Sequence, residues 1–158
     1  MIVSEREPRD GPAVASFLEA NHSARVARRG ALERPLDHPA LIAEGPDGRL
    51  LGVLTYVIDG ASCEILTLHA AERRGGVGTA LIEAVRERAA AAGCTRLWLI
   101  TTNDNVDALR FYQRRGFRLA ALHRGAVDES RRRLKAEIPE IGDHGIPLRD
   151  ELELEREP

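Results

Sequence analysis

The stretch ERRGGVGTAL, Glu72–Leu81, places three glycines directly before a segment with helical periodicity: Gly75, Gly76 and Gly78. Glycine inside a helix costs about 0.5–1 kcal/mol relative to alanine, because its unfolded backbone is so free. The first N–H groups of a helix have no partner within it, and the helix dipole is positive at that end. The sequence therefore predicts a loop whose backbone N–H groups hold an anion, in particular a phosphate.

The spacing of these glycines excludes two common nucleotide motifs. A P-loop requires GxxxxGK[ST], and no lysine follows Gly78, which argues against a nucleotide hydrolase of that type. A dinucleotide fingerprint requires GxGxxG, and the bulky Leu81 stands where the third glycine would be. What remains is the pattern R-x-x-G-x-G, from Arg73 to Gly78.

The segments around the loop alternate between strand and helix. Residues Cys63 to His69 predict a strand, and apolar side chains from Val77 onward recur at helical spacing until Gly93. The continuous apolar run LWLIT, from Leu97 to Thr101, is typical of a buried strand. A strand, a helix and a strand in this order predict a βαβ unit with parallel strands. A second helix is expected from Asn105 to Arg115.

The rest of the chain predicts a single domain over residues 1–158. Before the glycine loop we expect elements in this order: a strand (Met1 to Arg6), a helix (Arg9 to His22), a short helix followed by a loop (Ser23 to Pro39) and two strands (Leu41 to Glu44, Leu50 to Ile58). After the second helix we expect a strand (Phe117 to Val127), an irregular charged segment (Ser130 to Pro147) and a last strand (Leu148 to Glu155).

Composition narrows the classes of function. The net charge is −2 and the pI is about 6.2, which gives no electrostatic case for nucleic acid or for an anionic membrane. No apolar run is long enough to span a bilayer, and the N-terminus lacks the features of a signal peptide. Cys63 and Cys94 form no CxxC pair, and no Cys/His cluster suggests a metal. We expect a cytoplasmic protein with free thiols and no metal.

Two motifs in the predicted order resemble those of one family. R-x-x-G-x-G between a strand and a long helix, followed by NVDALRFYQRRGF at Asn105 to Phe117, is similar to the coenzyme A loop and the N-x-x-A-x-x-F-Y-x-x-x-G-F segment of the GNAT (GCN5-related) N-acetyltransferases. The resemblance implies an α/β (α+β) fold with a mixed, mostly antiparallel sheet and helices on both sides. It also implies transfer of an acetyl group from acetyl-CoA to a primary amine of a small molecule or peptide, and it allows a homodimer.

The resemblance assigns site residues position by position. It places the pantetheine arm of the coenzyme between two splayed strands, here Glu64 to His69 and Leu97 to Thr102. Leu66 and Leu68 match the strand positions whose backbone groups meet the acyl carbonyl and the pantetheine amides. The remaining coenzyme-binding positions comprise the glycine loop and one face of the second helix: Arg73, Arg74, Gly75, Gly76, Val77, Gly78, Thr79, Asn105, Ala108 and Tyr112. Many family members have proline at the place of Ala70.

The chemistry of the reaction suggests three catalytic groups. An amine with a pKa near ~10.4 is mostly protonated at pH 7, so freeing it costs about 4–5 kcal/mol and a base is useful. Glu64 is the only acid in the central strand and is the expected base, directly or through a water. The Leu66 N–H is the expected oxyanion donor, and Tyr112 is placed to protonate the departing thiolate.

Each assignment has a structural alternative. Tyr112 could be a core aromatic beside Phe111, Glu64 a solvated strand residue, and Asn105 only a helix N-cap. A protein that keeps the loop without chemistry would be an acyl-CoA-binding sensor or regulatory module, although such a module has no need of a phenol at the sulfur. The long segment from Ser130 to Pro147 predicts an ordered flap that selects the acceptor.

Overall fold

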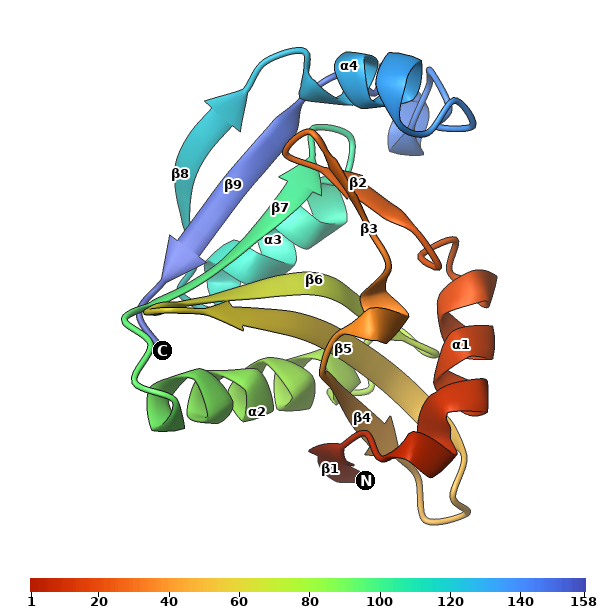
Figure 1. Ribbon diagram of the computed structural model, residues 1–158, viewed down its shortest axis with the longest axis vertical. Coiled ribbons are helices and arrows are strands. Elements are labelled where there is room, and N and C mark those ends of the chain that lie inside the picture. Colours follow the sequence, from red (N-terminus) through yellow and green to blue (C-terminus); the bar gives the residue numbers. More distant parts are fainter. The chain divides into compact units, whose positions relative to one another are not determined.

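The structure is a computed structural model that describes residues 1–158 (Figure 1). It divides into two compact units. The first unit contains Met1–Arg25, Arg34–Leu97 and Pro158, and the second contains Val26–Glu33 and Trp98–Glu157. This division does not test the single domain expected from the sequence, which stays a prediction. None of the helices combines the length and the apolar character that crossing a bilayer requires.

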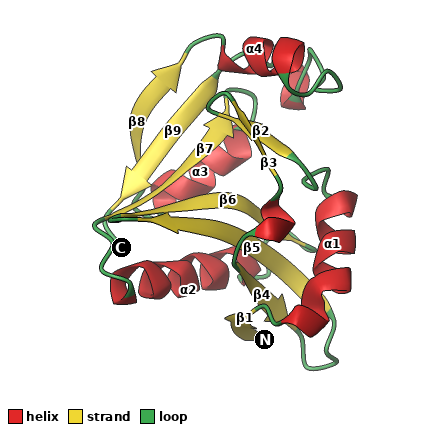
Figure 2. Cartoon of the chain, viewed as in Figure 1, coloured by secondary structure: helices red, strands yellow, loops and turns green.

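The first unit is built on an antiparallel sheet. Its elements in chain order are β1 (Ile2–Glu5), η1 (Pro8–Asp10), α1 (Gly11–Ala20), η2 (Pro35–Asp37), β4 (Ala40–Glu44), β5 (Leu50–Asp59), β6 (Ser62–Ala70) and α2 (Val77–Ala91). The strand order is β1-β4-β5-β6, and each neighbouring pair is antiparallel. Short turns join β4, β5 and β6 into the meander that the sequence predicts (Figure 2).

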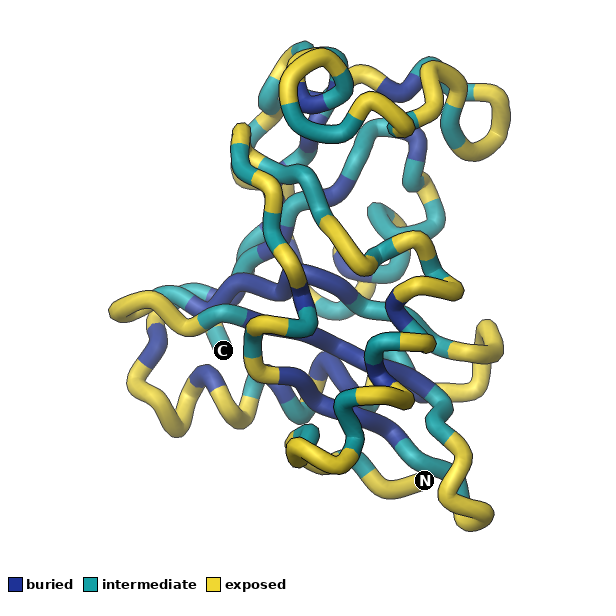
Figure 3. The backbone as a smooth tube through the Cα atoms, turned by 45° about the vertical axis from the view of Figure 1, so that its right-hand side comes forward, coloured by how far each residue is buried: buried dark blue, intermediate teal, exposed yellow.

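Helices cover both faces of this sheet. Val14 and Leu18 of α1 form a buried cluster with Ile42 and Val53, so α1 packs on the face to which Val53 points. A Cβ on the neighbouring Gly52 would lie 2.5 Å from the Val77 side chain of α2. Since successive residues of a strand face opposite sides, α2 covers the other face. Glycine at position 52 therefore permits the close approach of α2, and the central strands are buried (Figure 3).

The second unit combines a small sheet, a separate hairpin and two helices. Its elements in chain order are β2 (Val26–Arg28), β3 (Ala31–Glu33), β7 (Arg96–Thr102, whose first two residues belong to the first unit), α3 (Val106–Arg114), β8 (Arg118–His123), α4 (Ala126–Arg133), η3 (Asp143–Gly145) and β9 (Glu151–Arg156). The strand order is β7-β9-β8, with β8 and β9 antiparallel, and β2 pairs only with β3.

The fold class expected from the sequence is confirmed: a mixed sheet of mostly antiparallel strands with helices on both sides. Two segments were predicted wrongly. Ser23 to Pro39 contains the β2–β3 hairpin instead of a short α-helix. The strand predicted over Phe117 to Val127 ends at His123, and α4 begins at Ala126.

Candidate active site

The glycine loop joins β6 to α2 in the first unit. Residues 71–76 are all exposed, and the helix begins at Val77. Gly76 is the N-cap and adopts a left-handed conformation, with φ 77° and ψ −2°. Glycine adopts this conformation without the steric strain that a Cβ atom would cause. Gly76 carries no side chain that could cap the helix, so the backbone N–H groups of the first turn are presented from an open loop. The helix thus begins without a side-chain cap, and the binding of an anion at this turn stays a prediction.

A β-bulge interrupts the pairing of β6 with β5. Thr67 pairs with Thr55, whereas Ile65 pairs with Tyr56, so Leu66 is the extra residue on β6. A bulged residue lies outside the regular ladder and bends its strand. The expected oxyanion donor, the Leu66 N–H, is thus on the one residue of β6 that has no register partner on β5. Nothing in the apolar and polar pattern of β6 indicated this bulge.

Glu64 lies two residues before the bulge and is buried, with 6% of its surface exposed. The alternative that Glu64 is a solvated strand residue is therefore wrong. Its register partner on β5 is Val57. A carboxylate held in a strand interior, next to a bulge, has the restricted position that an acid–base group requires. Leu68, the other expected coenzyme contact on this strand, lies beyond the bulge and pairs with Leu54.

In the second unit, α3 carries the other predicted residues. Asn105 is the N-cap, and its Oδ1 accepts a hydrogen bond of 3.2 Å from the Ala108 N–H. Asn105, Ala108 and Tyr112 are spaced so that they share one face of the helix. Asn105 is therefore a helix N-cap, as the structural alternative proposed, and its contact with the coenzyme stays a prediction. It uses only the carbonyl oxygen of the side chain and leaves the amide nitrogen to another role.

Tyr112 is held between two aromatic rings. Its ring makes edge-to-face contacts with Phe111, at 5.2 Å between centroids, and with Phe117, at 5.4 Å. Burial raises the pKa of Tyr112 well above its ordinary range, and the charge of Arg115 acts in the opposite direction. The phenol therefore stays protonated at neutral pH, which is the form that an acid needs. The aromatic packing expected in the core alternative is present, and it also fixes the ring in one orientation.

The predicted residues therefore fall into two sets. Glu64, Leu66 and Leu68 share one strand of the first unit, and the loop Arg73–Thr79 follows that strand. Asn105, Ala108 and Tyr112 share one helix of the second unit. The structure brings together the members of each set, and the meeting of the two sets around one coenzyme stays a prediction.

The segment from Ser130 to Pro147 is ordered by two polar residues that sequence reasoning missed. Asn103 donates a hydrogen bond of 2.8 Å to the Pro147 carbonyl and accepts from the Arg149 and Asp150 N–H groups at 3.0 Å. Asp104 is buried and accepts a hydrogen bond of 2.9 Å from the Asp143 N–H. No spacing in the sequence identifies these long-range anchors.

Arg131 fixes the same segment from α4. Its guanidinium donates to the carbonyls of Ile138, Pro139 and Leu148 at 2.8–2.9 Å and pairs with Asp128 at 2.9 Å. The flap is thus ordered, as expected, although Ile141 is 58% exposed and does not anchor it. The neighbouring Arg132 is exposed, whereas Arg131 is held by these bonds.

The first unit also contains a histidine, His69, and two cysteines, Cys63 and Cys94, whose surroundings change their reactivity. The Ser23 hydroxyl lies 2.7 Å from His69 Nε2, and burial lowers the pKa of this histidine. Cys63 and Cys94 are free and buried, and burial raises the pKa of Cys63 to about 12. No group of three or more His, Cys, Asp or Glu side chains is arranged to hold a metal ion.

The chain is similar in sequence and in fold to known proteins. The model of the Acetyltransferase (GNAT) family matches residues 11–117. The uncharacterized protein YdhI of Bacillus subtilis (strain 168) is 49% identical over 110 residues, which cover 70% of this chain and 68% of YdhI. Streptothricin acetyltransferase of Streptomyces lavendulae is 30% identical over 141 residues, which cover 84% of this chain and 73% of that protein. A Bacillus subtilis acetyltransferase solved in complex with CoA shares the fold, with a TM-score of 0.71, 18% identity and coverage of 99% of this chain and 97% of that chain.

Proposed function

The chain belongs to the acetyltransferase (GNAT) family and is an acetyl-CoA-dependent acyltransferase, and we propose that a primary amine attacks the acetyl thioester directly. The amine nitrogen forms a bond to the carbonyl carbon, and the carbon–sulfur bond then breaks. The ammonium proton leaves before or during attack, and the thiolate of coenzyme A receives a proton as it departs. No covalent intermediate with the protein is required.

The single observation that supports this proposal most is the left-handed Gly76 at the start of α2. A helix start with an exposed, side-chain-free cap is an anion site, and the pyrophosphate of coenzyme A is such an anion. Residues Arg73–Thr79 hold the pyrophosphate in this proposal, Leu66 and Leu68 bind the pantetheine arm through backbone groups, and Asn105 and Ala108 line the coenzyme side of α3.

Three groups carry the chemistry. Glu64 accepts the proton of the acceptor ammonium, because a buried carboxylate is a base in a fixed position. The Leu66 N–H stabilises the negative charge on the acetyl oxygen in the tetrahedral intermediate. Tyr112 donates its proton to the thiolate, whose pKa resembles that of cysteine, near ~8.5. Tyr112 is neutral at pH 7 and can therefore donate, although burial, which raises its pKa, makes it a weaker acid than a free phenol.

We place the enzyme in the cytoplasm, because both cysteines are free thiols, as in reducing compartments. The family resemblance allows a homodimer. The acceptor is a small-molecule or peptide amine.

Screening a library of primary amines with acetyl-CoA, with release of free thiol as the readout, tests the proposal. We expect thiol release that depends on both the protein and one class of amine, together with an N-acetylated product detected by mass spectrometry. Tight binding of acetyl-CoA without thiol release from any amine would support the sensor alternative instead.

A further inference from the structure

A cavity of about 510 Å³ lies within the second unit, beside the β2–β3 hairpin, the end of β8 and helix α4. Its size falls in the range of small-molecule sites, roughly 300–1,000 Å³. The polar groups on its wall are mainly charged: Arg29, His123, Arg124, Glu129, Ser130, Arg133 and Glu151. Such a lining is too polar for an apolar ligand. A polar ligand would bind to those charged groups that have no partner within the protein.

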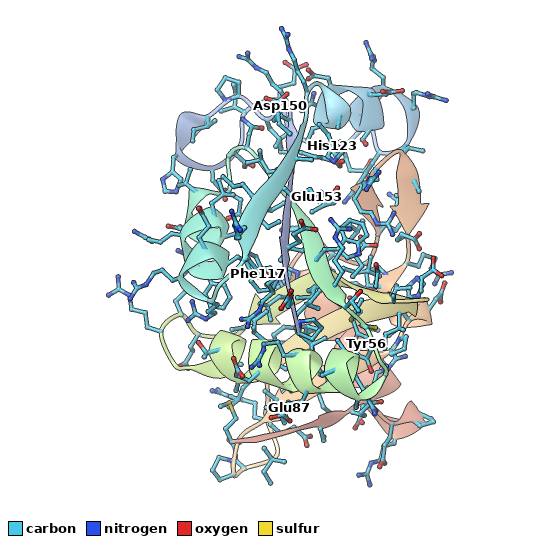
Figure 4. The ribbon with its side chains drawn as sticks, turned by 90° about the vertical axis from the view of Figure 1, so that its left-hand side faces the viewer. Tyr56, Glu87, Phe117, His123, Asp150 and Glu153 are labelled. Carbon is cyan, nitrogen blue, oxygen red and sulfur yellow. The ribbon has the colours of Figure 1, made fainter.

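Most of the charges have partners within the unit. Arg29 pairs with Glu153 at 3.0 Å and lies over the Trp98 ring at 5.7 Å, and His123 Nε2 also lies 3.0 Å from Glu153. Figure 4 shows His123 and Glu153 on the neighbouring strands β8 and β9. Arg133 pairs with Glu129 at 2.8 Å along α4. These groups are satisfied without a ligand.

Glu151 is the exception among the acids. It is 98% buried, since only 2% of its surface is exposed, and it lines the cavity. Its Oε1 accepts a hydrogen bond of 3.0 Å from the Arg29 backbone N–H, and its Oε2 is not one of the fully enclosed side-chain atoms that lack a partner. A carboxylate oxygen on the wall of a cavity can accept a charge-assisted hydrogen bond from a ligand N–H group placed there.

The surroundings of Glu151 balance its charge only in part. Burial raises the pKa of Glu151, and the Arg29 N–H and the charges of His123, Arg28 and Arg29 act in the opposite direction. Ser130 of α4 also lines the cavity, is 3% exposed, and its hydroxyl forms no hydrogen bond within the protein. A carboxylate oxygen and a hydroxyl on one buried wall suit a protonated amine.

Arg124 supplies the opposite charge. It follows β8, is exposed, lines the cavity, and forms no ion pair with any acid of the chain. An arginine of this kind binds a carboxylate or phosphate by two parallel hydrogen bonds. The cavity therefore offers a partly compensated negative group on its buried wall and, at an exposed position, a positive group that forms no ion pair within the chain.

We propose that this cavity binds a small zwitterion of amino-acid size, with its ammonium group on Glu151 and Ser130 and its carboxylate on Arg124. The inference rests on the proposed function in one respect: this zwitterion is the acetyl acceptor, and its ammonium group leaves Glu151 before it gives its proton to Glu64 and reacts. The binding site itself is argued only from the residues of the second unit.

Binding measured without acetyl-CoA tests the site separately from the reaction. The probes are the twenty protein amino acids, assayed by thermal shift and then by calorimetry, together with the decarboxylated amine and the deaminated acid of each ligand that binds. We expect binding by at least one amino acid and at least about tenfold weaker binding by both of its analogues, since each loses one charged hydrogen bond.

Two variants test whether Glu151 and Arg124 bind the amino acid. Glu151→Gln and Arg124→Gln should each weaken the amino acid about tenfold or more, while Arg132→Gln, an exposed arginine on α4 outside the cavity lining, should not. Arg124 is exposed, so its variant remains informative even if Glu151→Gln fails to fold. Absence of binding by every amino acid, binding by the acid alone, or equal binding by the Arg124 variant would each overturn the proposal.

A final assay separates the acceptor from other ligands. Thiol release from acetyl-CoA should occur with the amino acid that binds, and Arg124→Gln should raise its KM without changing acetyl-CoA affinity. An amino acid that binds to the cavity but is not acetylated, while another amine is, would refute the acceptor identity and leave both the site and the acetyltransferase activity intact.

Discussion

The left-handed glycines at the two ends of α2 give a matched pair of perturbations. Gly76 precedes the helix with φ 77°, and Gly93 follows it with φ 78°. A Cβ at either position would meet no heavy atom within 4 Å. Alanine therefore adds backbone strain of the same kind at both ends, about 1–2 kcal/mol for a left-handed residue. Urea unfolding should show a similar loss of stability for Gly76→Ala and Gly93→Ala.

Coenzyme binding should separate the two variants. When the strain that alanine adds at position 76 is relieved by rotation of the backbone, the N–H groups of Val77 and Gly78 turn away from the pyrophosphate position. We expect Gly76→Ala to weaken acetyl-CoA at least tenfold by calorimetry, about 1.4 kcal/mol. Gly93→Ala should bind the coenzyme as the parent does. Equal affinity in both variants, or an equal loss in both, would refute the role of the Gly76 loop in binding the pyrophosphate.

Three further perturbations probe the catalytic base, the flap and a buried histidine. Glu64→Gln should lower the acetylation rate about 10²-fold, and most at low pH where the amine is most protonated; a parallel rate–pH profile would contradict its role as base. Arg131→Ala, which removes three bonds to carbonyls, should lower the free energy of unfolding by about 2–3 kcal/mol, against less than about 0.5 kcal/mol for the exposed Arg132→Ala. Burial lowers the pKa of His69 in the folded state, so below about pH 6.5 the unfolded chain binds a proton that the folded chain does not. The free energy of unfolding should therefore decrease more steeply in the parent than in His69→Gln as the pH is lowered below about 6.5.

Local patterns predicted the elements that carry the coenzyme residues. The helical periodicity from Val77, the turn glycines and the apolar run at Leu97–Thr101 each depend on neighbours in the chain, and the structure confirms all of them. Helix α4 also has a local signal that was overlooked, since Asp128 and Glu129 occupy its first turn and arginines fill its last turn. Such a charge order stabilises a helix through its dipole.

Long-range contacts decide the features that the sequence did not reveal. The β2–β3 hairpin turns at Arg29 and Gly30, both left-handed, and Arg29 bonds to Glu151 and Glu153, more than 120 residues away in the chain. No local pattern encodes these partners. The bulge at Leu66 is likewise a property of the pairing between two strands, and it is invisible in either strand alone.

The central claim, acetyl transfer with Tyr112 as the acid, is tested most directly by the two tyrosine variants of this chain, which contains only these two tyrosines. Tyr112→Phe keeps the ring and its contacts with Phe111 and Phe117 but deletes the proton donor. Tyr56→Phe deletes the other hydroxyl, which donates to Glu5 at 2.8 Å, and serves as the control. With the amine found by screening, single-turnover acetylation by Tyr112→Phe should be about 10²-fold slower or more at unchanged acetyl-CoA affinity, while Tyr56→Phe reacts at the parent rate. Acetylation by Tyr112→Phe at the parent rate would contradict the account.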